Sequence, residues 1–357
     1  MMCSSYEMFL HLTRRGIGHQ SYYPDISFDW GDLYALSVKH GLQAVVLDGI
    51  GSLPEVKRPN QEMLLNWIGE VLQGYEQRYA LYEKAIGELA SFYIQHGYKM
   101  MVLKGYACSL DWPKPNHRPC GDIDIWLFGK QKVADSLLEK EKGVTVDTSH
   151  HHHTVFDWKG FSVENHFDFI NVHHHKSNAR FEDILKELGK EDSHFVEIAG
   201  ERVYLPSPNL HALFLLKHMA MHFAAEGIML RQLVDWGLYV EKHSKEIDWQ
   251  WLEGVIIQFG MKELYNVFNA ICVGDLGFRV NIFPQVQFSP DLKDKVLKEI
   301  LNPRFDIEPP KGFFKRIVFK VRRWKANEWK HKLCYKDSMW SAFWSGVRNH
   351  LLKPSSI

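Results

Sequence analysis

The sequence predicts an α+β protein, in which helical segments at both ends flank a central block of short strands. Among its 357 residues, those from 61 to 96 place apolar side chains at helical spacing, and this spacing returns after Ser207-Pro208. Between these segments, short apolar runs alternate with turn residues, which is typical of strands. We expect four regions: N-terminal helices over 1–97, an α/β core over 98–206, a helical domain over 207–310 and a basic tail over 311–357.

Composition places the chain among ordinary globular proteins. Apolar residues make up 45% and charged residues 24%, and 43 basic side chains balance 43 acidic ones, so no net charge directs the chain to nucleic acid or membrane. Its five cysteines are scattered without a CxxC pair, which indicates a reducing compartment and argues against a cysteine zinc site. No apolar run reaches the roughly 18 residues of a membrane span, and no export signal is recognisable. We expect a cytoplasmic protein without a transmembrane segment.

The N-terminal region predicts helices. Asp29 is a good N-cap for a helix over 30–40, which Gly41 ends. A longer helical segment follows over 61–96, and Gly74 indicates a break or kink within it. No side-chain pattern in this region points to a reaction.

Residues 98–206 predict a core of short strands. The apolar run 99–103 ends at Lys104-Gly105, which indicates a buried strand that turns into a helix. A tight turn at 158–160 joins two strands into a hairpin, and Gly200 marks a second hairpin. Together with a helix over 131–140, the expected strands cover residues 99–103, 122–128, 144–146, 154–157, 161–169 and 195–205.

A pair of aspartates gives the strongest chemical signal. In Gly121-Asp-Ile-Asp-Ile125, a strand would place Asp122 and Asp124 on one face while the isoleucines enter the core. Two nearby carboxylates repel each other unless a cation lies between them, and hard divalent cations prefer oxygen ligands. Alone, the motif is also compatible with a solvated strand end. Its apolar neighbours would bury the strand, however, and this context favours a divalent metal site.

The turn at Lys104-Gly105 is a candidate phosphate site. A helix N-terminus offers free N–H groups and a positive dipole, Gly105 would let the backbone approach a ligand, and Lys104 would add a charge. Arg118, four residues before Asp122, could also reach a phosphate. Taken by itself, Lys104 is better explained as an exposed loop lysine.

These motifs together resemble a known family. Strand, glycine turn, helix and a strand with alternating aspartates are similar to the polymerase-β-type nucleotidyltransferase fold. The segments LKG, GDIDIWL, VENHFDF and LLKHMAMHF…LRQLVDW, spread over about residues 80–245, resemble an uncharacterised bacterial nucleotidyltransferase family of the polymerase-β-like superfamily. Where that superfamily usually has a Gly-Ser turn, this chain has Lys104-Gly105.

The resemblance implies a mixed sheet with N-terminal helices before it and a helical domain after it. It implies a metal-dependent enzyme that moves a nucleoside monophosphate from an NTP to an acceptor hydroxyl, with Mg²⁺ or Mn²⁺ as cofactor. Asp122 and Asp124 would hold the metal, and Glu164 would be the third acid, with Asp168 as the fallback. Candidates for nucleotide binding are Lys104, Gly105, Arg118, Lys217, His218 and His222.

Histidines form two runs without zinc-finger spacing, at 150–153 and 173–175. If the turn at 159–160 is a two-residue loop, His151 and His153 share the face of Glu164, whereas a three-residue loop moves them away.

Two pairs at helical i, i+4 spacing lie after residue 207. His218 and His222 share a helix face, which is compatible with metal binding or with packing. Arg231 and Asp235 have the same spacing, and we expect them to form a structural ion pair.

Two alternative functions stay open. A catalytically silent member of the fold would bind a nucleotide or a partner, and a His-rich metal-binding protein would need at least three imidazoles around one ion. Residues 311–336 carry ten basic side chains and one acid. This segment could contact anionic lipid or nucleic acid, or pack on the body as a helix with a basic face. The acceptor and the base of the NTP have no signature in the sequence.

Overall fold

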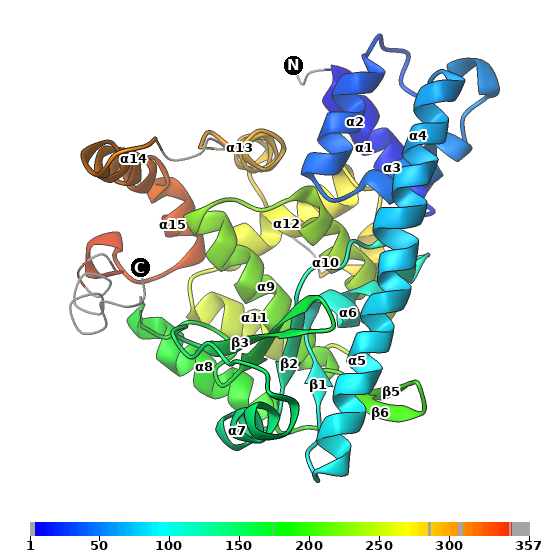
Figure 1. Cartoon of the computed structure of the whole chain (residues 1–357). Coiled ribbons are helices and arrows are strands. Elements are labelled where there is room, and N and C mark those ends of the chain that lie inside the picture. The colour runs from blue at the N-terminus through cyan, green and yellow to red at the C-terminus, as the bar shows by residue number, and fades with distance from the viewer. Residues whose placement is uncertain (1–3, 174, 285–286, 306–309, 343, 345–357) are drawn as a thin grey trace.

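The computed structural model describes residues 4–173, 175–284, 287–305, 310–342 and 344. Cys3, His174 and the end of the basic tail lie outside the described residues. Helices surround one mixed sheet, which is the α+β architecture that the sequence predicts (Figure 1).

Within the described residues, the sheet has six strands: β1 (Met101–Val102), β2 (Ile123–Trp126), β3 (His153–Trp158), β4 (Phe161–His166), β5 (Phe195–Ile198) and β6 (Glu201–Tyr204). Their order is β3-β4-β2-β1-β6-β5. The pairs β2–β4 and β1–β6 are parallel, and the other neighbours are antiparallel. Because β2 and β4 are paired residue by residue, side chains at matched positions share one face of the sheet.

The helices before the sheet are α1 (Ser4–Gly16), α2 (Trp30–Lys39), α3 (Gln43–Gly51), α4 (Gln61–Val71) and α5 (Arg78–Gln95), with the short turn η1 (Glu55–Lys57). The carboxylate of Asp29 accepts a hydrogen bond from the N–H of Asp32 and caps α2, as predicted. A π-helical turn, η2 (Leu72–Gln77), joins α4 to α5. Gly74 lies in this turn, so the expected break is a local widening of one long rod, which Figure 1 shows along one side of the molecule.

The core region also contains α6 (Lys104–Ser109), η3 (Pro115–His117), α7 (Gln131–Lys142) and α8 (Lys176–Leu188). The strand predicted at 144–146 is wrong. Gly143 ends α7 in a left-handed conformation, and the chain then meets β3 through a single bridge between Asp147 and Val155. Val146 packs into a hydrophobic cluster without joining the sheet, so its apolar pattern reflects burial alone.

After Ser207 the chain is helical, with α9 (Pro208–Ala225), α10 (Leu230–His243), α11 (Trp249–Gln258), α12 (Lys262–Gly274), η4 (Val280–Ile282), α13 (Pro290–Leu301), α14 (Phe313–Ala326) and α15 (Glu328–Cys334). Pro208 occupies the first turn of α9, and the hydroxyl of Ser207 makes no capping bond. No helix in the described part of the chain is long and apolar enough to cross a membrane.

Two hydrophobic clusters cover the two faces of the sheet. One contains α5 and α7 together with Ile123 and Ile125 of β2. The other joins the N-terminal helices to α9–α13 and includes Trp126. Because the two isoleucines enter the first cluster, Asp124 between them turns to the opposite face, toward α9.

Candidate active site

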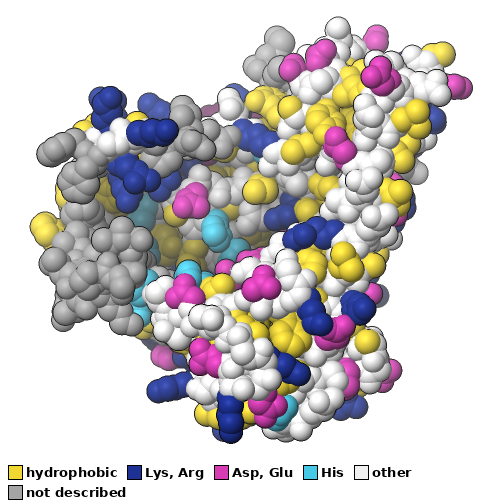
Figure 2. Space-filling model, in the orientation of Figure 1, with side chains coloured by type: hydrophobic (Ala, Val, Ile, Leu, Met, Phe, Trp, Pro, Cys, Tyr) yellow, Lys and Arg dark blue, Asp and Glu magenta, His cyan; other side chains and the backbone are white. Residues whose placement is uncertain are grey.

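A cleft of about 650 Å³ lies between this sheet face and the helices α9 and α10. Its volume is within the roughly 300–1,000 Å³ of small-molecule sites. Figure 2 shows the hollow, with histidine side chains on its walls. Eight predicted site residues line it: Lys104, Gly105, Arg118, Asp122, Asp124, Glu164, His218 and His222.

Two carboxylates and an imidazole form a compact acid group on neighbouring strands. Asp124 on β2 is paired in register with Glu164 on β4, which confirms that they face one cleft from adjacent strands. His166 Nε2 lies 3.0 Å from Asp124 Oδ1 and 3.6 Å from Glu164 Oε2. Ligand atoms of these three side chains lie within 4.8 Å of one another. Two hard oxygen donors and an imidazole at this spacing fit one divalent ion.

His166 was not among the predicted site residues, although it follows Glu164 by two positions and shares its strand face. Its Nδ1 lies 3.1 Å from the carbonyl oxygen of Asp168, and its Nε2 faces the Asp124 carboxylate. A neutral imidazole has one N–H, so two acceptors favour the protonated ring. Burial lowers the pKa of His166, but the hydrogen bonds to Asp124 and Glu164 outweigh burial and raise it.

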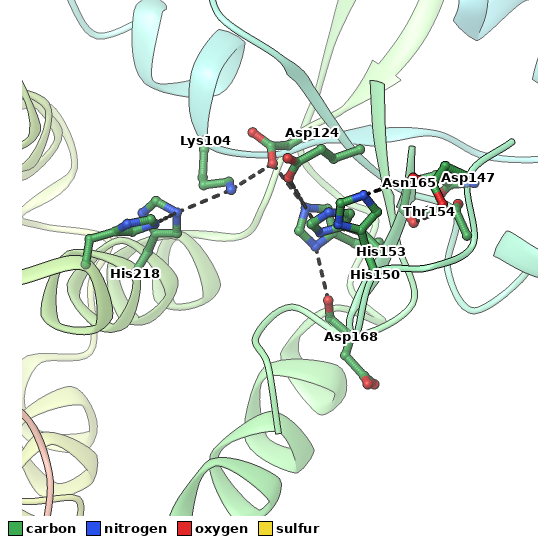
Figure 3. A network of polar contacts seen from close by, with 12 residues as sticks. Lys104, Asp124, Asp147, His150, His153, Thr154, Asn165, Asp168 and His218 are labelled. Carbon is green, nitrogen blue, oxygen red and sulfur yellow. Dashed lines mark hydrogen bonds and ion pairs between the residues drawn. The ribbon is translucent and has the colours of Figure 1, made fainter. Parts of the chain in front are cut away.

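Lys104 supplies a second positive charge. It begins α6 with φ +29°, a backbone conformation that non-glycine residues rarely adopt and that is concentrated at functional sites. Its Nζ lies 2.7 Å from Asp124 Oδ1 and 3.4 Å from His218 Nε2 (Figure 3). Its side chain is 15% exposed, so Lys104 is not a solvent-facing loop lysine.

The charges in this group compensate one another. Burial lowers the pKa of Lys104, but Asp124 and Glu164 outweigh burial and raise it. Burial would raise the pKa of Asp124, yet Lys104 and His166 hold it well below its usual range. Without a metal, two cationic side chains thus occupy the surroundings of the acids.

Gly105 has a packing role. A Cβ there would lie 2.9 Å from Tyr82 Oη, and this hydroxyl donates a 2.8 Å hydrogen bond to the carbonyl oxygen of Asp122. The helix α6 starts at Lys104 itself, and it has only six residues. A helix this short has a small dipole, so at this turn the Lys104 charge is the main attraction for a phosphate.

Asp122 lies just before β2, and its side chain is exposed. It is not part of the compact acid group. Partial desolvation in the cleft, followed by the charge of Asp124, raises the pKa of Asp122 to about 6. The two aspartates of the motif therefore occupy different environments, which their mutual repulsion explains.

The first histidine run reaches the acid group through its last members. The turn after β3 is a two-residue loop, in which Lys159 and Gly160 have φ of +56° and +81°. His153 is paired with His166, and its Nδ1 lies 3.6 Å from Glu164 Oε2. With this two-residue loop, His153 shares the sheet face of Glu164.

The two histidines before His153, His151 and His152, differ in their positions relative to the cleft. His151 precedes β3, and its ring lies 5.3 Å from that of His173. His152 lines the cleft, and ligand atoms of His152, His153 and His166 also lie within 4.8 Å of one another. Burial, with a contribution from His166, lowers the pKa of His152 to about 2 and that of His153 to about 4. Both rings are therefore neutral at pH 7, the form that binds metals.

Arg118 lines the cleft, but its guanidinium is already paired. Its Nε and Nη2 donate to the two carboxylate oxygens of Asp235 at 2.8 and 3.0 Å, and Trp112 Nε1 donates to the same carboxylate at 2.8 Å. The predicted ion pair between Arg231 and Asp235 is therefore wrong. Helical spacing puts them on one face of α10, but the loop before β2 brings Arg118 to Asp235 instead.

Of the three nucleotide-binding candidates on α9, two face the cleft and one does not. Lys217 does not line the cleft: it is 1% exposed, and its Nζ lies 5.0 and 4.4 Å from the ring centroids of Phe181 and Tyr335. His218 and His222 face the cleft, with their Nε2 atoms 3.1 Å apart. Burial and then the charge of Lys104 lower the pKa of both histidines.

Asp168, the fallback third acid, belongs to a different contact. Its carboxylate forms an ion pair with Lys186 on α8, and Figure 3 shows it pointing away from Asp124. Only its backbone carbonyl faces His166.

Comparison with known proteins identifies the family of this chain. Curated proteins give no significant match. One solved structure, described as an antigenic nucleotidyltransferase-like protein from Paracoccidioides brasiliensis, aligns with a TM-score of 0.36 and 12% identity over 56% of this chain and 93% of its own. Residues 27–271 match the family described as uncharacterised nucleotidyltransferase. Because the match covers more than half of the sequence, this chain belongs to the uncharacterised nucleotidyltransferase family.

Proposed function

We propose that this protein transfers a nucleoside monophosphate from an NTP to an acceptor hydroxyl and releases pyrophosphate. The observation that carries the proposal is the in-register pair of Asp124 and Glu164 with Lys104 beside it, in one cleft of a chain from this family. The acceptor oxygen would form a bond to the α-phosphorus while the bond to the pyrophosphate oxygen breaks. The hydroxyl proton would pass to a carboxylate, for which Glu164 is the candidate.

Asp124, Glu164 and His166 would hold a divalent ion, and Asp122 faces the same cleft. Such an ion neutralises charge on the triphosphate and on the leaving pyrophosphate. Mg²⁺ suits the carboxylates, whereas the imidazole of His166 favours Mn²⁺ more than an all-oxygen site would. Protonated His166 would first lose its proton, since a metal ligand must present a lone pair.

Lys104 would bind the phosphates. Its ammonium lies against Asp124, so a cation that neutralises Asp124 would leave the lysine available to phosphate oxygens. Gly105, Arg118, His218 and His222 line the cleft around it and are the further candidates for nucleotide contacts. We leave Lys217 out of this set because it packs among aromatic rings outside the cleft.

One alternative has a specific observation in its favour. The His-rich metal-binding function needs three imidazoles near one ion, and His152, His153 and His166 meet that condition. The silent-member alternative loses support, because it expects an acid missing beside the aspartates, and Glu164 is there.

The finer assignments are also proposals: placement in the polymerase-β-like superfamily, a cytoplasmic location, and contact of the basic tail with an anionic surface. For the last, α14 exposes Val318 and Val321 among its basic side chains.

A labelled-transfer experiment tests the function. The full-length protein is incubated with each α-³²P NTP, a cell extract, and Mg²⁺ or Mn²⁺, and transferred label is measured. We expect transfer by wild type, loss in Asp124→Asn and Glu164→Gln, and retention in Asp168→Asn, whose carboxylate lies outside the acid group. Equal labelling by wild type and Asp124→Asn would refute the proposal.

A further inference from the structure

Because Arg118 pairs with Asp235, Arg231 makes no hydrogen bond to that carboxylate. Both oxygens of Asp235 accept hydrogen bonds from Arg118. The Nε of Arg231 is buried and has no hydrogen-bond partner among the described residues. A buried donor without a partner costs free energy, and a charged one costs more, so the protein by itself leaves this guanidinium incompletely paired.

The surroundings of Arg231 also favour an anion. It lies in the first turn of the 14-residue helix α10, where the helix dipole is positive. Burial and then the charge of Arg118 lower the pKa of Arg231, but an arginine stays protonated at neutral pH. The charge of Asp235 acts in the opposite direction and raises this pKa. The site thus places two guanidiniums beside the one carboxylate of Asp235, whose two oxygens both accept from Arg118.

Gly41 packs directly beside the side chain of Arg231. A Cβ at Gly41 would lie 3.4 Å from Cδ and Nη1 of Arg231 and 3.4 Å from Cγ of Pro119. Gly41 has φ +63°, so a side chain there would be strained as well as crowded. The guanidinium therefore packs beside α2 and the loop before β2, and it lines the same cleft as Lys104 and Asp124.

We propose that Arg231 is an anion-binding residue of the cleft, which takes a phosphate or carboxylate group of the reactants on the wall opposite the acid group. This inference deepens the proposed function and relies on it for the identity of the ligand. The anion has two possible sources, the triphosphate of the NTP or an acidic group on the acceptor. A planar guanidinium binds either through two parallel N–H donors.

Three variants of the full-length protein test the proposal. Arg231→Met removes the charge, and Arg231→Gln keeps polar donors if the methionine variant does not fold. Arg202→Met is the matched control, because this exposed arginine stacks on Phe195 at the far edge of the sheet. Calorimetry measures binding of tripolyphosphate without metal, of a non-hydrolysable NTP with Mg²⁺, and of inorganic phosphate to the NTP-loaded protein.

Both Arg231 variants should weaken one class of anion by about ten- to hundredfold, the scale of a lost charged hydrogen bond, while Arg202→Met binds like wild type. Weaker tripolyphosphate and NTP binding assigns Arg231 to the triphosphate. Unchanged NTP binding with weaker phosphate binding to the loaded protein assigns it to the acceptor. Wild-type affinity for all three probes would overturn the inference.

Thermal unfolding separates ligand binding from a structural role. Because Arg231→Met removes repulsion with Arg118, its melting temperature without ligand should be unchanged or higher. A lower melting temperature with wild-type anion affinity would mark a structural arginine and overturn the inference. If wild type binds no nucleotide, the proposed function fails, but the tripolyphosphate titration still tests Arg231.

Discussion

The two walls of the cleft, the sheet wall and the helical wall of α9 and α10, differ in how their charged side chains are paired. On the sheet wall every charge of the acid group has a partner: Lys104 and His166 both contact Asp124, and His166 approaches Glu164. On the helical wall, His218 and His222 have lowered pKa values, and Arg231 has a buried donor without a partner. On the proposed function, a cation would exchange with side chains on the first wall, whereas an anion would add to the second. A metal-bound polyphosphate combines both charges.

The largest effect should come from breaking the sheet wall. Asp124→Asn leaves Lys104 and His166 without their shared carboxylate, so we expect the free energy of unfolding to fall by about 3 kcal/mol, the cost of breaking a buried ion pair. Nucleotide transfer should fall by about a hundred- to a thousandfold. Urea denaturation and the labelled-transfer assay measure the two effects.

Asp122→Asn is the matched control for that change. Desolvation is the main cause that raises the pKa of Asp122, and repulsion by the charge of Asp124 is the second. Because Asp122→Asn removes this repulsion, the stability of the metal-free protein should stay unchanged or increase. Equal destabilisation by both substitutions would contradict the contrast between the two aspartates.

Lys104→Ala tests whether Lys104, which pairs with Asp124, also binds the phosphates of the nucleotide. It should weaken NTP binding by about 1–3 kcal/mol, the range for a lost charged hydrogen bond, and Lys104→Ser should retain part of the affinity. Titration with a non-hydrolysable NTP and Mg²⁺ measures this. Lys190→Ala is the control, because Lys190 pairs only with Glu187 at the surface. Wild-type affinity in Lys104→Ala would restrict the lysine to holding Asp124.

The contact between Glu182 and the backbone at residues 169 and 170 should make the stability of the protein depend on pH. Glu182 on α8 accepts hydrogen bonds from the backbone N–H groups of Phe169 and Ile170 at 2.8 and 3.0 Å, and both residues line the cleft. Burial raises the pKa of Glu182 from 4.5 to about 7 against these hydrogen bonds. Between these values the folded state keeps a proton that the unfolded state has lost. The contribution of Glu182 to the unfolding free energy therefore falls as pH rises through this window.

Glu182→Gln, which cannot ionise, should remove that contribution. The stability of the variant relative to wild type should rise between pH 4.5 and 7 by about 3 kcal/mol, as measured by urea denaturation at several pH values. Glu187→Gln, at an exposed position of α8, is the control. A difference that stays constant with pH would show that burial does not raise the pKa of Glu182 in the folded protein.

The sheet wall was largely predictable because its chemistry follows local periodicity. A two-residue repeat placed Asp124 opposite the isoleucines, and the same repeat placed Glu164 and His166 on one face. Turn chemistry also decided the place of His153, once Lys159-Gly160 proved to be a two-residue loop. Pairing across strands then carried these local preferences into the site.

The helical wall was less predictable because its partners are distant in sequence. Spacing of four residues made Arg231 the natural partner of Asp235, yet Arg118, 117 residues away, holds that carboxylate. The spacing on α9 did not tell which side chain faces the cleft, since α9 is buried on nearly all sides and Lys217 adjoins aromatic rings of α8 and the segment after α15. Such choices depend on packing between elements, which no window of sequence contains.

The smallest effect on nucleotide binding should come from Lys217, which lies near the cleft without lining it. Burial lowers the pKa of Lys217 to about 8, so the folded state loses this proton before the unfolded state does. Its contribution to stability therefore rises with pH between about 8 and 10.5. Lys217→Met keeps a flexible apolar chain against Phe181 and Tyr335. The desolvation that it relieves at pH 7 exceeds the cation–π contacts that it loses, which are worth about 1 kcal/mol, so stability at pH 7 should rise by about 2 kcal/mol. Urea denaturation at pH 7 and 9.5 should show a smaller gain with pH in the variant than in wild type. Affinity for a non-hydrolysable NTP should equal that of wild type, and a tenfold loss would return Lys217 to the nucleotide site.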